Sequence, residues 1–224
     1  MEKEIKKRWD SKRESIYSLI SNIDRLKRNV RNDLVSCNEK DRITALIVRI
    51  MLYTSERVGN EESASNGHFG VTQFQNKHIK VDGNRILLDY VGKSGVEHEK
   101  SFSDETSAVI IRDLLSRKNQ FIFTTKDGFR VKPDRVNRYL SNFNAKSKDI
   151  RGYNANRMMV IELSRIGKVE EKLRPKTFNE SLRKIGAKVG HGASTLRTHY
   201  LLPEVEESFY KNGFISKQFI NKFL

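Results

Sequence analysis

Several residue types are scarce in this chain of 224 residues, and each scarcity excludes something. Cys37 is the only cysteine, so the chain can form no internal disulfide and no zinc site built from several cysteines. The five histidines lack the spacing of metal ligands, and no structural metal is expected. Only three prolines interrupt the chain. Together these absences indicate an intracellular, reducing compartment.

Long apolar runs are absent as well. No stretch approaches the roughly 20 apolar residues that a helix needs to span a bilayer. The first residues, MEKEIKKRWDSKRES, lack the apolar core of a secretory signal, and their acidic side chains do not fit a transit peptide. We therefore expect no membrane segment and no secretion.

Charge is abundant, and it is strongly biased to one sign. The chain has 43 Lys and Arg against 28 Asp and Glu, which gives a formal net charge of +15. Hydrophobic residues make up 37% of it. So large a basic excess favours a polyanionic partner such as nucleic acid. An anionic membrane surface is the main rival, and the lack of an apolar run weakens it.

Apolar residues recur at helical spacing along most of the chain. The stretch from Lys3 to about Val30, which includes Ile5 and Trp9, predicts one or two amphipathic helices. A second stretch begins at about Lys40 and is expected to deliver Arg57 near its end. Further helices are expected after Asp104, in RVNRYLSNF, from about Arg151, from about Thr177, and around Leu201 to Lys211.

A zone between these helices favours strands. Val71 to Val81, Arg85 to Val91 and Val96 to Phe102 alternate in polarity or carry β-branched and aromatic residues. Asp82-Gly83-Asn84 and Gly92-Lys93-Ser94-Gly95 supply the turns between them. The sequence therefore predicts a three-stranded antiparallel sheet in an otherwise helical protein, a fold of the α+β class that is mainly α.

Tyr200 stands in an unusual setting, VGHGASTLRTHY. A phenol has a pKa near 10, so it needs cations or a base nearby to become a nucleophile at neutral pH. His191, Arg197 and His199 precede Tyr200 within nine residues, and the small residues among them allow a tight helix–turn segment. Taken alone, one tyrosine among seven is more often a packed amphipathic side chain, and this segment an ordinary basic helix.

Three further cations have the chemistry to handle a phosphodiester. Arg57 in SERVGNEE and Arg151 in SKDIRGYNAN are candidates for a bidentate clamp on the non-bridging oxygens, which gain charge in the transition state. Lys93, at a glycine-flanked hairpin tip, can donate a proton to a leaving 5′ oxygen. Singly, each is more often a solvated surface charge. Together with Tyr200 they describe a site that cuts and reseals DNA without metal, ATP or any other cofactor.

No competing catalytic motif is present. The chain has no glycine-rich phosphate loop of the NTPase type, no HExxH and no GxSxG. Acidic clusters such as Glu61-Glu62 are typical of solvated helix faces, and nothing marks the convergent carboxylates of a two-metal nuclease.

Four ordered blocks carry a family resemblance, from about Ile43 to Glu207. They are RVGN followed by GVTQFQNKHIKV, then LLDYVGKSGVEHE, then FRVKPDRVNRYLSNF leading into KDIRGYNAN, and finally KVGHGASTLRTHY. In these blocks the chain resembles the catalytic domain of type IB DNA topoisomerases, most of all the small poxvirus and bacterial-type enzymes. The resemblance implies the helical catalytic fold that topoisomerases of this type share with tyrosine recombinases.

The resemblance also implies roles for particular residues. Tyr200 corresponds to the nucleophile that forms a 3′-phosphotyrosyl bond. Arg57, Arg151 and His191 correspond to contacts with the scissile phosphate oxygens, and Lys93 to the general acid. Two further positions, Lys148 and Asn156, match supporting residues of the family. The implied activity is relaxation of supercoiled duplex DNA by a monomer that contacts backbone phosphates and uses no cofactor, metal or small-molecule substrate.

The chain departs from the poxvirus pattern in two places. Residues 1–38 are expected to form a helical N-terminal extension and residues 39–224 the catalytic domain, so the β-rich N-terminal domain of the poxvirus enzymes is absent or removed. After RVGN the chain has EESASNGH, where the poxvirus helix contributes basic and aromatic groups to base recognition. The resemblance therefore does not imply the pentamer preference of the poxvirus enzymes.

Three alternatives to a topoisomerase stay open. A tyrosine recombinase shares the fold and chemistry, but it usually has His-x-x-Arg where this chain has Lys148-Asp149-Ile150-Arg151. It would also need a synaptic tetramer, and the last segment, ISKQFINKFL, either serves exchange between subunits or packs on its own domain. A non-catalytic DNA-binding protein and an architectural chromatin-type protein are the other two, and neither needs a phenol among cations.

Overall fold

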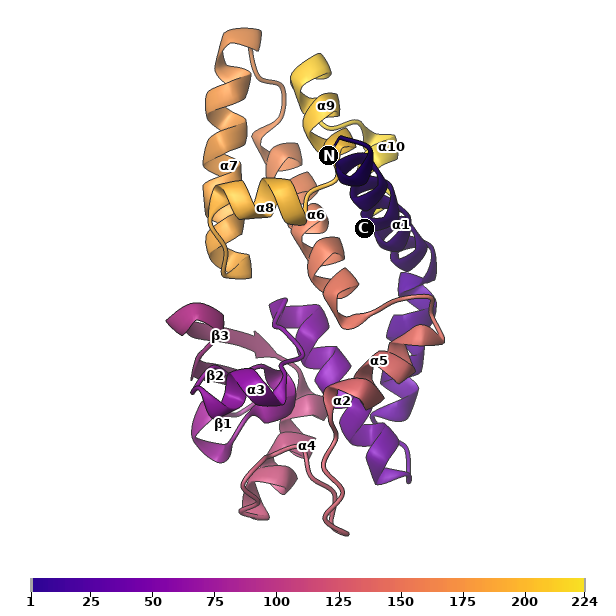
Figure 1. The fold of residues 1–224 in the computed structure, drawn as a ribbon, viewed down its shortest axis with the longest axis vertical. Coiled ribbons are helices and arrows are strands. Elements are labelled where there is room, and N and C mark those ends of the chain that lie inside the picture. Colours follow the sequence, from indigo (N-terminus) through magenta and orange to yellow (C-terminus); the bar gives the residue numbers. More distant parts are fainter. Residues whose placement is uncertain (1, 224) are drawn as a thin grey trace. The chain divides into compact units, whose positions relative to one another are not determined.

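The structure is mainly helical and contains one small sheet (Figure 1). The computed structural model describes residues 2–223, with side chains from Arg13 onward except Ser94. Ile5 and Trp9, which helped to predict the first helix, therefore lie outside the described side chains. Nowhere in the described part of the chain does a helix combine the length and apolar character needed to cross a membrane. The expected class, α+β and mainly α, is confirmed.

Two compact units make up the chain. The first combines Met1–Ser21 with Asp149–Leu224, and the second is Asn22–Lys148. Helix α1 (Glu2–Asp33) is one continuous helix, where the sequence allowed one or two, and it contributes residues to both units. The expected boundary of the catalytic domain after residue 38 stays a prediction.

Helix α2 (Glu39–Thr54) forms the core of the second unit. Asn38 caps its start, where the side-chain oxygen accepts hydrogen bonds from the backbone of the first turn. The helix ends at Thr54 because Ser55 adopts a left-handed conformation with φ of 61°. Arg57 therefore lies just beyond the helix. Most apolar positions of α2 are fully buried, among them Ile43, Leu46, Ile47, Ile50 and Met51.

Three antiparallel strands pair in sequence order: β1 (Ile79–Asp82), β2 (Arg85–Val91) and β3 (Glu97–Ser103). In β2 every second residue, among them Leu88 and Tyr90, turns toward the core and the residues between them toward solvent. This alternation is the pattern from which the sheet was predicted, and the three-stranded antiparallel sheet is confirmed.

The first strand is shorter than predicted. Two 3-10 turns, Val71–Gln73 and Asn76–His78, precede β1, so the strand begins at Ile79 and the expectation of a strand from Val71 was wrong. Four consecutive side chains starting at Val71 are buried, whereas a half-buried strand would alternate. The backbone N–H of Val71 donates instead to the carbonyl of Arg57, at 2.9 Å. The segment thus supports the loop that carries Arg57.

Three more helices complete the second unit. Helix α4 packs on β1 and β2, and the Asp104 carboxylate caps its first turn. Helix α5, which contains all but the last two residues of the predicted RVNRYLSNF pattern, packs on α2. The three helices are α3 (Glu61–Ser65), α4 (Glu105–Ser116) and α5 (Pro133–Ser141).

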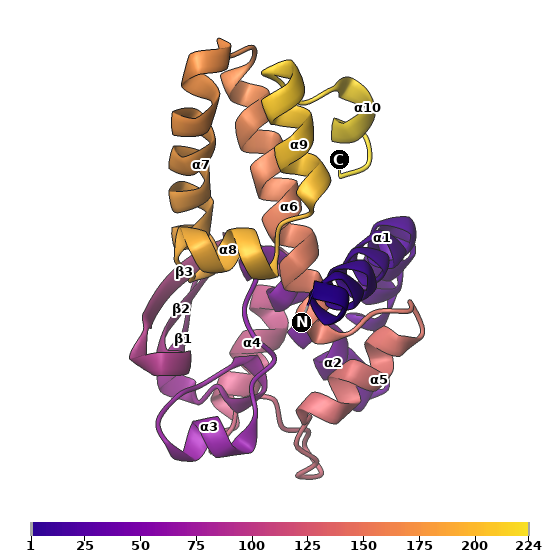
Figure 2. The same ribbon diagram turned by 45° about the horizontal axis from the view of Figure 1, so that its top comes forward.

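The first unit is built around helix α6. Figure 2 shows α6 running between α7 and α9, with α8 across one end of α7. The predicted helices from about Arg151, from about Thr177 and around Leu201 are therefore all present. Their bounds are α6 (Ser147–Ile166), α7 (Arg174–Val189), α8 (Ala193–His199), α9 (Pro203–Asn212) and α10 (Lys217–Ile220).

The C-terminal segment packs on its own unit. The ring of Phe223 is 1% exposed and stacks on Tyr153 of α6 with centroids 6.2 Å apart. The backbone carbonyl of Phe223 accepts a hydrogen bond from Arg157 Nε at 3.2 Å. Of the two alternatives for ISKQFINKFL, the structure has the segment folded back on the chain to which it belongs.

Candidate active site

The turn between α7 and α8 positions His191. Helix α7 ends at Gly190, which is left-handed with φ of 77°. The N–H of His191 then donates to the carbonyl of Gly186, at 2.8 Å. A Cβ on Gly186 would lie 2.7 Å from the His191 carbonyl oxygen, so only glycine lets the turn approach α7 this closely. Backbone geometry therefore fixes the position of the His191 Cα, from which the imidazole extends.

Tyr200 follows the last residue of the short helix α8. Its N–H donates to the carbonyl of Leu196 at 3.0 Å, and Leu196 is fully buried. The Tyr200 hydroxyl lies 3.1 Å from Nε2 of His191, and the two rings stack with centroids 4.8 Å apart. The phenol and the imidazole, nine residues apart in sequence, are thus in direct contact.

Arg151 brings a buried cation to this pair. The side chain comes from α6 and is only 3% exposed. Its Nη2 donates to the carbonyl of Val189 at 2.9 Å and lies 2.8 Å from His191 Nε2. The guanidinium carbon is 5.6 Å from the centre of the Tyr200 ring, within the range of a cation–π interaction. Three of the predicted site residues therefore form one cluster in the first unit.

The hydrogen bonds define the protonation state of His191. A guanidinium has only donors, so Nε2 of His191 must be the acceptor of the Arg151 contact. An imidazole whose Nε2 accepts is neutral and carries its proton on Nδ1. The Tyr200 hydroxyl is then the second donor, after Arg151, to the lone pair of His191 Nε2. In this geometry His191 can take the phenol proton.

Asn156 holds the backbone around the phenol. It is fully buried on α6, one turn beyond Arg151. Its Nδ2 donates to the carbonyl of Tyr200 at 2.8 Å and to that of Gly152 at 2.7 Å, and its Oδ1 accepts from the N–H of Leu202 at 2.8 Å. The Asn156 amide therefore holds the peptide groups on both sides of Leu201, directly after Tyr200. Its supporting role in the reaction stays a prediction.

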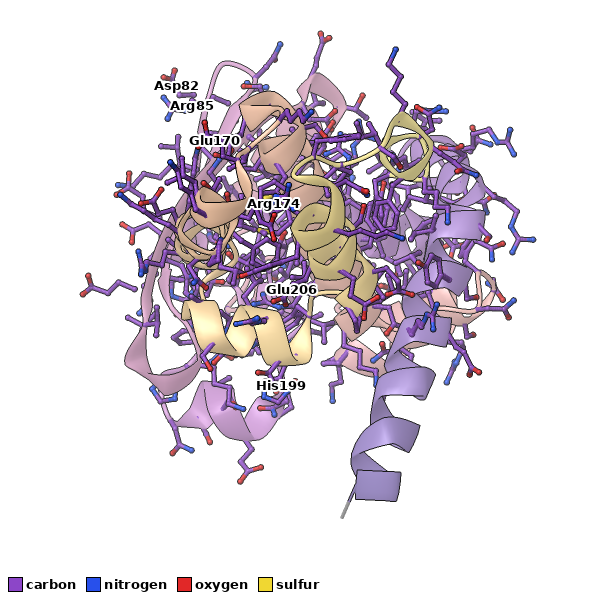
Figure 3. All side chains as sticks on the ribbon, turned by 90° about the horizontal axis from the view of Figure 1, so that it is seen from above. Asp82, Arg85, Glu170, Arg174, His199 and Glu206 are labelled. Atoms are coloured by element: carbon purple, nitrogen blue, oxygen red, sulfur yellow. The ribbon has the colours of Figure 1, made fainter. Side chains whose placement is uncertain are left out.

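The other two basic residues next to Tyr200 lie elsewhere. Arg197 forms an ion pair with Glu206 of α9, and His199 is exposed. Figure 3 labels His199 on the outer side of α8 and Glu206 on α9. Sequence proximity suggested that both cations lie beside the phenol, whereas in the structure the contacts of the Tyr200 side chain are with His191 and Arg151.

In the second unit, Arg57 is carried by a tightly supported loop. Its carbonyl accepts from Val71, and the next carbonyl, of Val58, accepts from Thr72 at 3.0 Å. Gly59 has φ of +96°, and a Cβ on Gly70 would lie 2.4 Å from the Gly59 Cα. The backbones at Gly59, in the RVGN motif, and at Gly70 thus pass each other in van der Waals contact. The Arg57 side chain is half-buried at this loop.

Lys93 is exposed at the tip of the β2–β3 hairpin. It opens the 3-10 turn η3 (Lys93–Gly95), and the N–H of Gly92 donates to the carbonyl of Val96 at 2.7 Å to close the hairpin. Lys148 is likewise exposed, in the first turn of α6. Arg57, Lys93 and Lys148 belong to the second unit, whereas the other four predicted site residues belong to the first.

One charged residue was missed by sequence reasoning. Glu56, directly before Arg57, is 1% exposed, and Tyr90, His98 and Lys100 surround its carboxylate. The period-two alternation of β2 and β3 could have revealed it, since that alternation puts the three partners on one buried face. Such a polar set on a core face requires a buried partner of opposite charge.

Among the side chains that the structure describes, no group of three or more His, Cys, Asp or Glu is placed to hold a metal ion.

Comparison with known proteins identifies the family. Residues 2–211 match the family model described as the catalytic core of eukaryotic DNA topoisomerase I. The chain belongs to this topoisomerase family. All seven predicted site residues lie within the matched range: Arg57, Lys93, Lys148, Arg151, Asn156, His191 and Tyr200.

Similar proteins include a viral topoisomerase. The chain is 29% identical over 154 residues to the DNA topoisomerase 1B of Acanthamoeba polyphaga mimivirus, an alignment that covers 63% of this chain and 46% of the viral protein. The topoisomerase-family chain thus spans about half the length of this curated relative.

Two solved structures of the XerH site-specific recombinase are also similar, each at 15% sequence identity. The pre-cleavage complex with difH substrate has a TM-score of 0.46, covering 87% of this chain and 52% of the XerH chain. The post-cleavage complex with palindromic difH substrate has a TM-score of 0.49, covering 82% and 49%.

Proposed function

We propose that this member of the topoisomerase family is a type IB enzyme that relaxes supercoiled duplex DNA by cutting and rejoining one strand. The observation that carries the proposal is the contact of the Tyr200 hydroxyl with His191 Nε2, which in turn contacts Arg151 Nη2. A phenol beside a proton acceptor and a buried cation is equipped to attack a phosphodiester. Membership of the family supports the same reaction.

The cleavage step exchanges one phosphoester for another. The Tyr200 oxygen bonds to the scissile phosphorus while the bond from phosphorus to the 5′ oxygen breaks. The phenol proton passes to Nε2 of His191, and the leaving 5′ oxygen takes a proton from Lys93. The product is a 3′-phosphotyrosine and a free 5′-hydroxyl. Because the ester is conserved, the 5′-hydroxyl can later reverse the step, and neither ATP nor a metal is required.

The cations stabilise the transition state in this scheme. The planar guanidinium groups of Arg57 and Arg151 bind the non-bridging oxygens as these gain charge. Once His191 has taken the phenol proton, its Nε2–H becomes a donor and can contact a phosphate oxygen as well. Lys148 and Asn156 support the site, the latter through its hydrogen bonds beside Tyr200.

Duplex DNA is the proposed partner, bound as a monomer through its backbone phosphates. The net charge of +15 favours this, and the affinity should fall steeply with salt. A tyrosine recombinase is the second candidate. Two observations favour relaxation: Lys148 stands where recombinases usually have histidine, and Phe223 packs within its own unit rather than being left to bind a second subunit.

The decisive assay uses supercoiled plasmid in EDTA without ATP. The wild-type chain should relax the plasmid fully, and denaturation during the reaction should trap a covalent protein–DNA adduct. Tyr200→Phe should bind plasmid normally and give neither product. A well-folded wild-type preparation that forms no adduct and relaxes nothing contradicts the proposal. An adduct confined to paired sites, with exchange of strands and no relaxation, favours the recombinase.

A further inference from the structure

Glu56 is a carboxylate enclosed by the second unit. Its Oε1 lies 2.6 Å from Lys100 Nζ and 3.8 Å from His98 Nδ1, and its Oε2 accepts a short hydrogen bond from the Tyr90 hydroxyl. A buried carboxylate is costly unless it is paired and hydrogen-bonded. The Lys100 ammonium pairs with Oε1 by charge, and the hydrogen bond from Tyr90 to Oε2 is directional and fixes the orientation of the group.

The partners of Glu56 all come from the strands that present Lys93. Tyr90 on β2 and His98 on β3 are direct cross-strand neighbours, with rings stacked 5.0 Å apart. A Cβ on Gly92 would lie 2.6 Å from the His98 ring, so this ring packs directly beneath the residue that precedes Lys93. The cluster therefore extends to the base of the hairpin tip.

The same cluster holds the loop that carries Arg57. Glu56 is the preceding residue, so its pairing restrains the Arg57 backbone. Lys100 adds a second restraint, because its Nζ also donates to the carbonyl of Thr54 at 2.8 Å, at the end of α2. Both ends of the short link from α2 to Arg57 are thus tied to strand β3.

We propose that Glu56 is a positioning residue, which holds the Lys93 hairpin against the Arg57 loop so that Lys93 can protonate the oxygen that leaves the phosphate bound by Arg57. This inference rests on the proposed function, since it takes Arg57 as a phosphate contact and Lys93 as the proton donor. Buried ion pairs contribute little net stability compared with apolar residues of the same shape, but they define geometry. Misplacement of a reacting group by about 1 Å can cost about 100-fold in rate.

The test compares two leaving groups in the full-length chain. A cleavage site is first mapped on plasmid with the wild type, and duplexes are then made with either a 5′ oxygen or a 5′ sulfur at the scissile bond. A thiolate leaves without a proton, so defects in proton donation disappear on the sulfur substrate. Glu56→Gln keeps the shape of the side chain and removes its charge. It should slow single-turnover cleavage of the oxygen substrate about tenfold or more. The slowing on the sulfur substrate should be smaller by a factor of at least about three.

The double variant Glu56→Gln/Lys93→Ala gives a second readout. If Glu56 acts through Lys93, adding Glu56→Gln to Lys93→Ala should change the oxygen rate by less than about threefold, because coupled residues are not additive. Asp104→Asn is the matched control, since it removes the charge from another part-buried ion pair of the same unit, with Arg49. It should affect the two substrates equally.

The outcomes separate the two proposals. Equal slowing on oxygen and sulfur, with additive effects in the double variant, overturns the positioning role of Glu56. A wild-type chain that forms no adduct with plasmid overturns the proposed function instead. If Glu56→Gln does not fold, Tyr90→Phe replaces it, because that change removes only one hydroxyl from the carboxylate. The same difference between leaving groups is expected for it.

Discussion

Arg151 Nη2 and the Tyr200 hydroxyl both approach one atom, Nε2 of His191, at 2.8 and 3.1 Å. A neutral imidazole has one lone pair there, so the two donors share it. A scissile phosphate offers the guanidinium a stronger, charged acceptor. In the proposed reaction, Arg151 turns its donor to the phosphate and leaves the lone pair to the phenol. The proposed function therefore predicts that substrate binding and activation of the nucleophile are linked through a single nitrogen.

The first prediction concerns the tautomer of His191. In the DNA-free chain, long-range ¹H–¹⁵N spectra should show His191 neutral, with its proton on Nδ1 and an accepting Nε2, because a guanidinium can only donate. A His191 resonance with the proton on Nε2 is incompatible with the Arg151 contact.

Arg151→Lys is expected to be far from conservative. An ammonium group is a point charge and cannot contact Val189, His191 and a phosphate with the fixed fork of a guanidinium. Loss of such a donor typically costs about 10²–10³ in rate. Single-turnover cleavage should fall by that amount, while DNA affinity changes little in a chain of +15 net charge. Rates within a few-fold of wild type would remove Arg151 from the chemistry.

Asn156→Ala should loosen the segment around the nucleophile. The change leaves the Tyr200 carbonyl and the Leu202 N–H without their partners, and an unpaired buried group costs about 1–3 kcal/mol. We expect a lower free energy of unfolding by urea and a larger loss of cleavage rate than of stability. Ser164→Ala on the same helix removes a local hydrogen bond to Val160 and is the matched control. It should leave cleavage unchanged.

Much of the fold followed from local pattern. The period of α2 and the alternation of β2 depend on neighbours in sequence, and both predictions are confirmed. The strand expected from Val71 was wrong because the hydrogen bonds of that segment go to Arg57, a partner outside its own pattern. Non-local pairing of this kind leaves no periodic signal.

The candidate site shows the same limit. Motifs alone named Arg151, His191 and Tyr200, and the structure brings these three together. Sequence proximity also favoured Arg197 and His199, but the Arg197 guanidinium is paired with Glu206 of α9 and His199 is exposed. Glu56 was missed because the three residues that surround its carboxylate lie on the sheet, far from it in sequence. The roles of Arg57, Lys93 and Lys148 stay predictions.

His78 should make stability depend on pH. Burial lowers its pKa to about 4, with a smaller contribution from the charge of Lys77, while Asp89 acts in the opposite direction. The unfolded chain protonates this group near pH 6.5, so the folded state binds fewer protons between about pH 6.5 and 4. The free energy of unfolding should therefore fall as the pH drops through that window, by about 3 kcal/mol in all.

His78→Asn isolates this effect. The Asn oxygen can still accept the Gln75 N–H that His78 Nδ1 accepts at 3.1 Å, but it does not titrate. Urea unfolding from pH 4 to 7 should show a weaker pH dependence for the variant than for the wild type. Parallel curves for His78→Asn and the wild type would contradict the assignment.

Arg197 provides the contrast with Arg151. Both are arginines near Tyr200, but Arg151 is 3% exposed and contacts His191, whereas Arg197 lies at the surface and its guanidinium pairs with Glu206. Exposed ion pairs contribute about 0–1 kcal/mol, so Arg197→Ala should lower the unfolding free energy only slightly. Its cleavage rate should stay within about threefold of wild type, whereas a loss of about 10²–10³ is expected for Arg151→Lys.

Glu206→Gln, which removes the partner and keeps the cation, should behave like Arg197→Ala if the pair only joins α8 to α9. A loss in Arg197→Ala that is absent in Glu206→Gln would instead give the Arg197 charge its own role on the DNA.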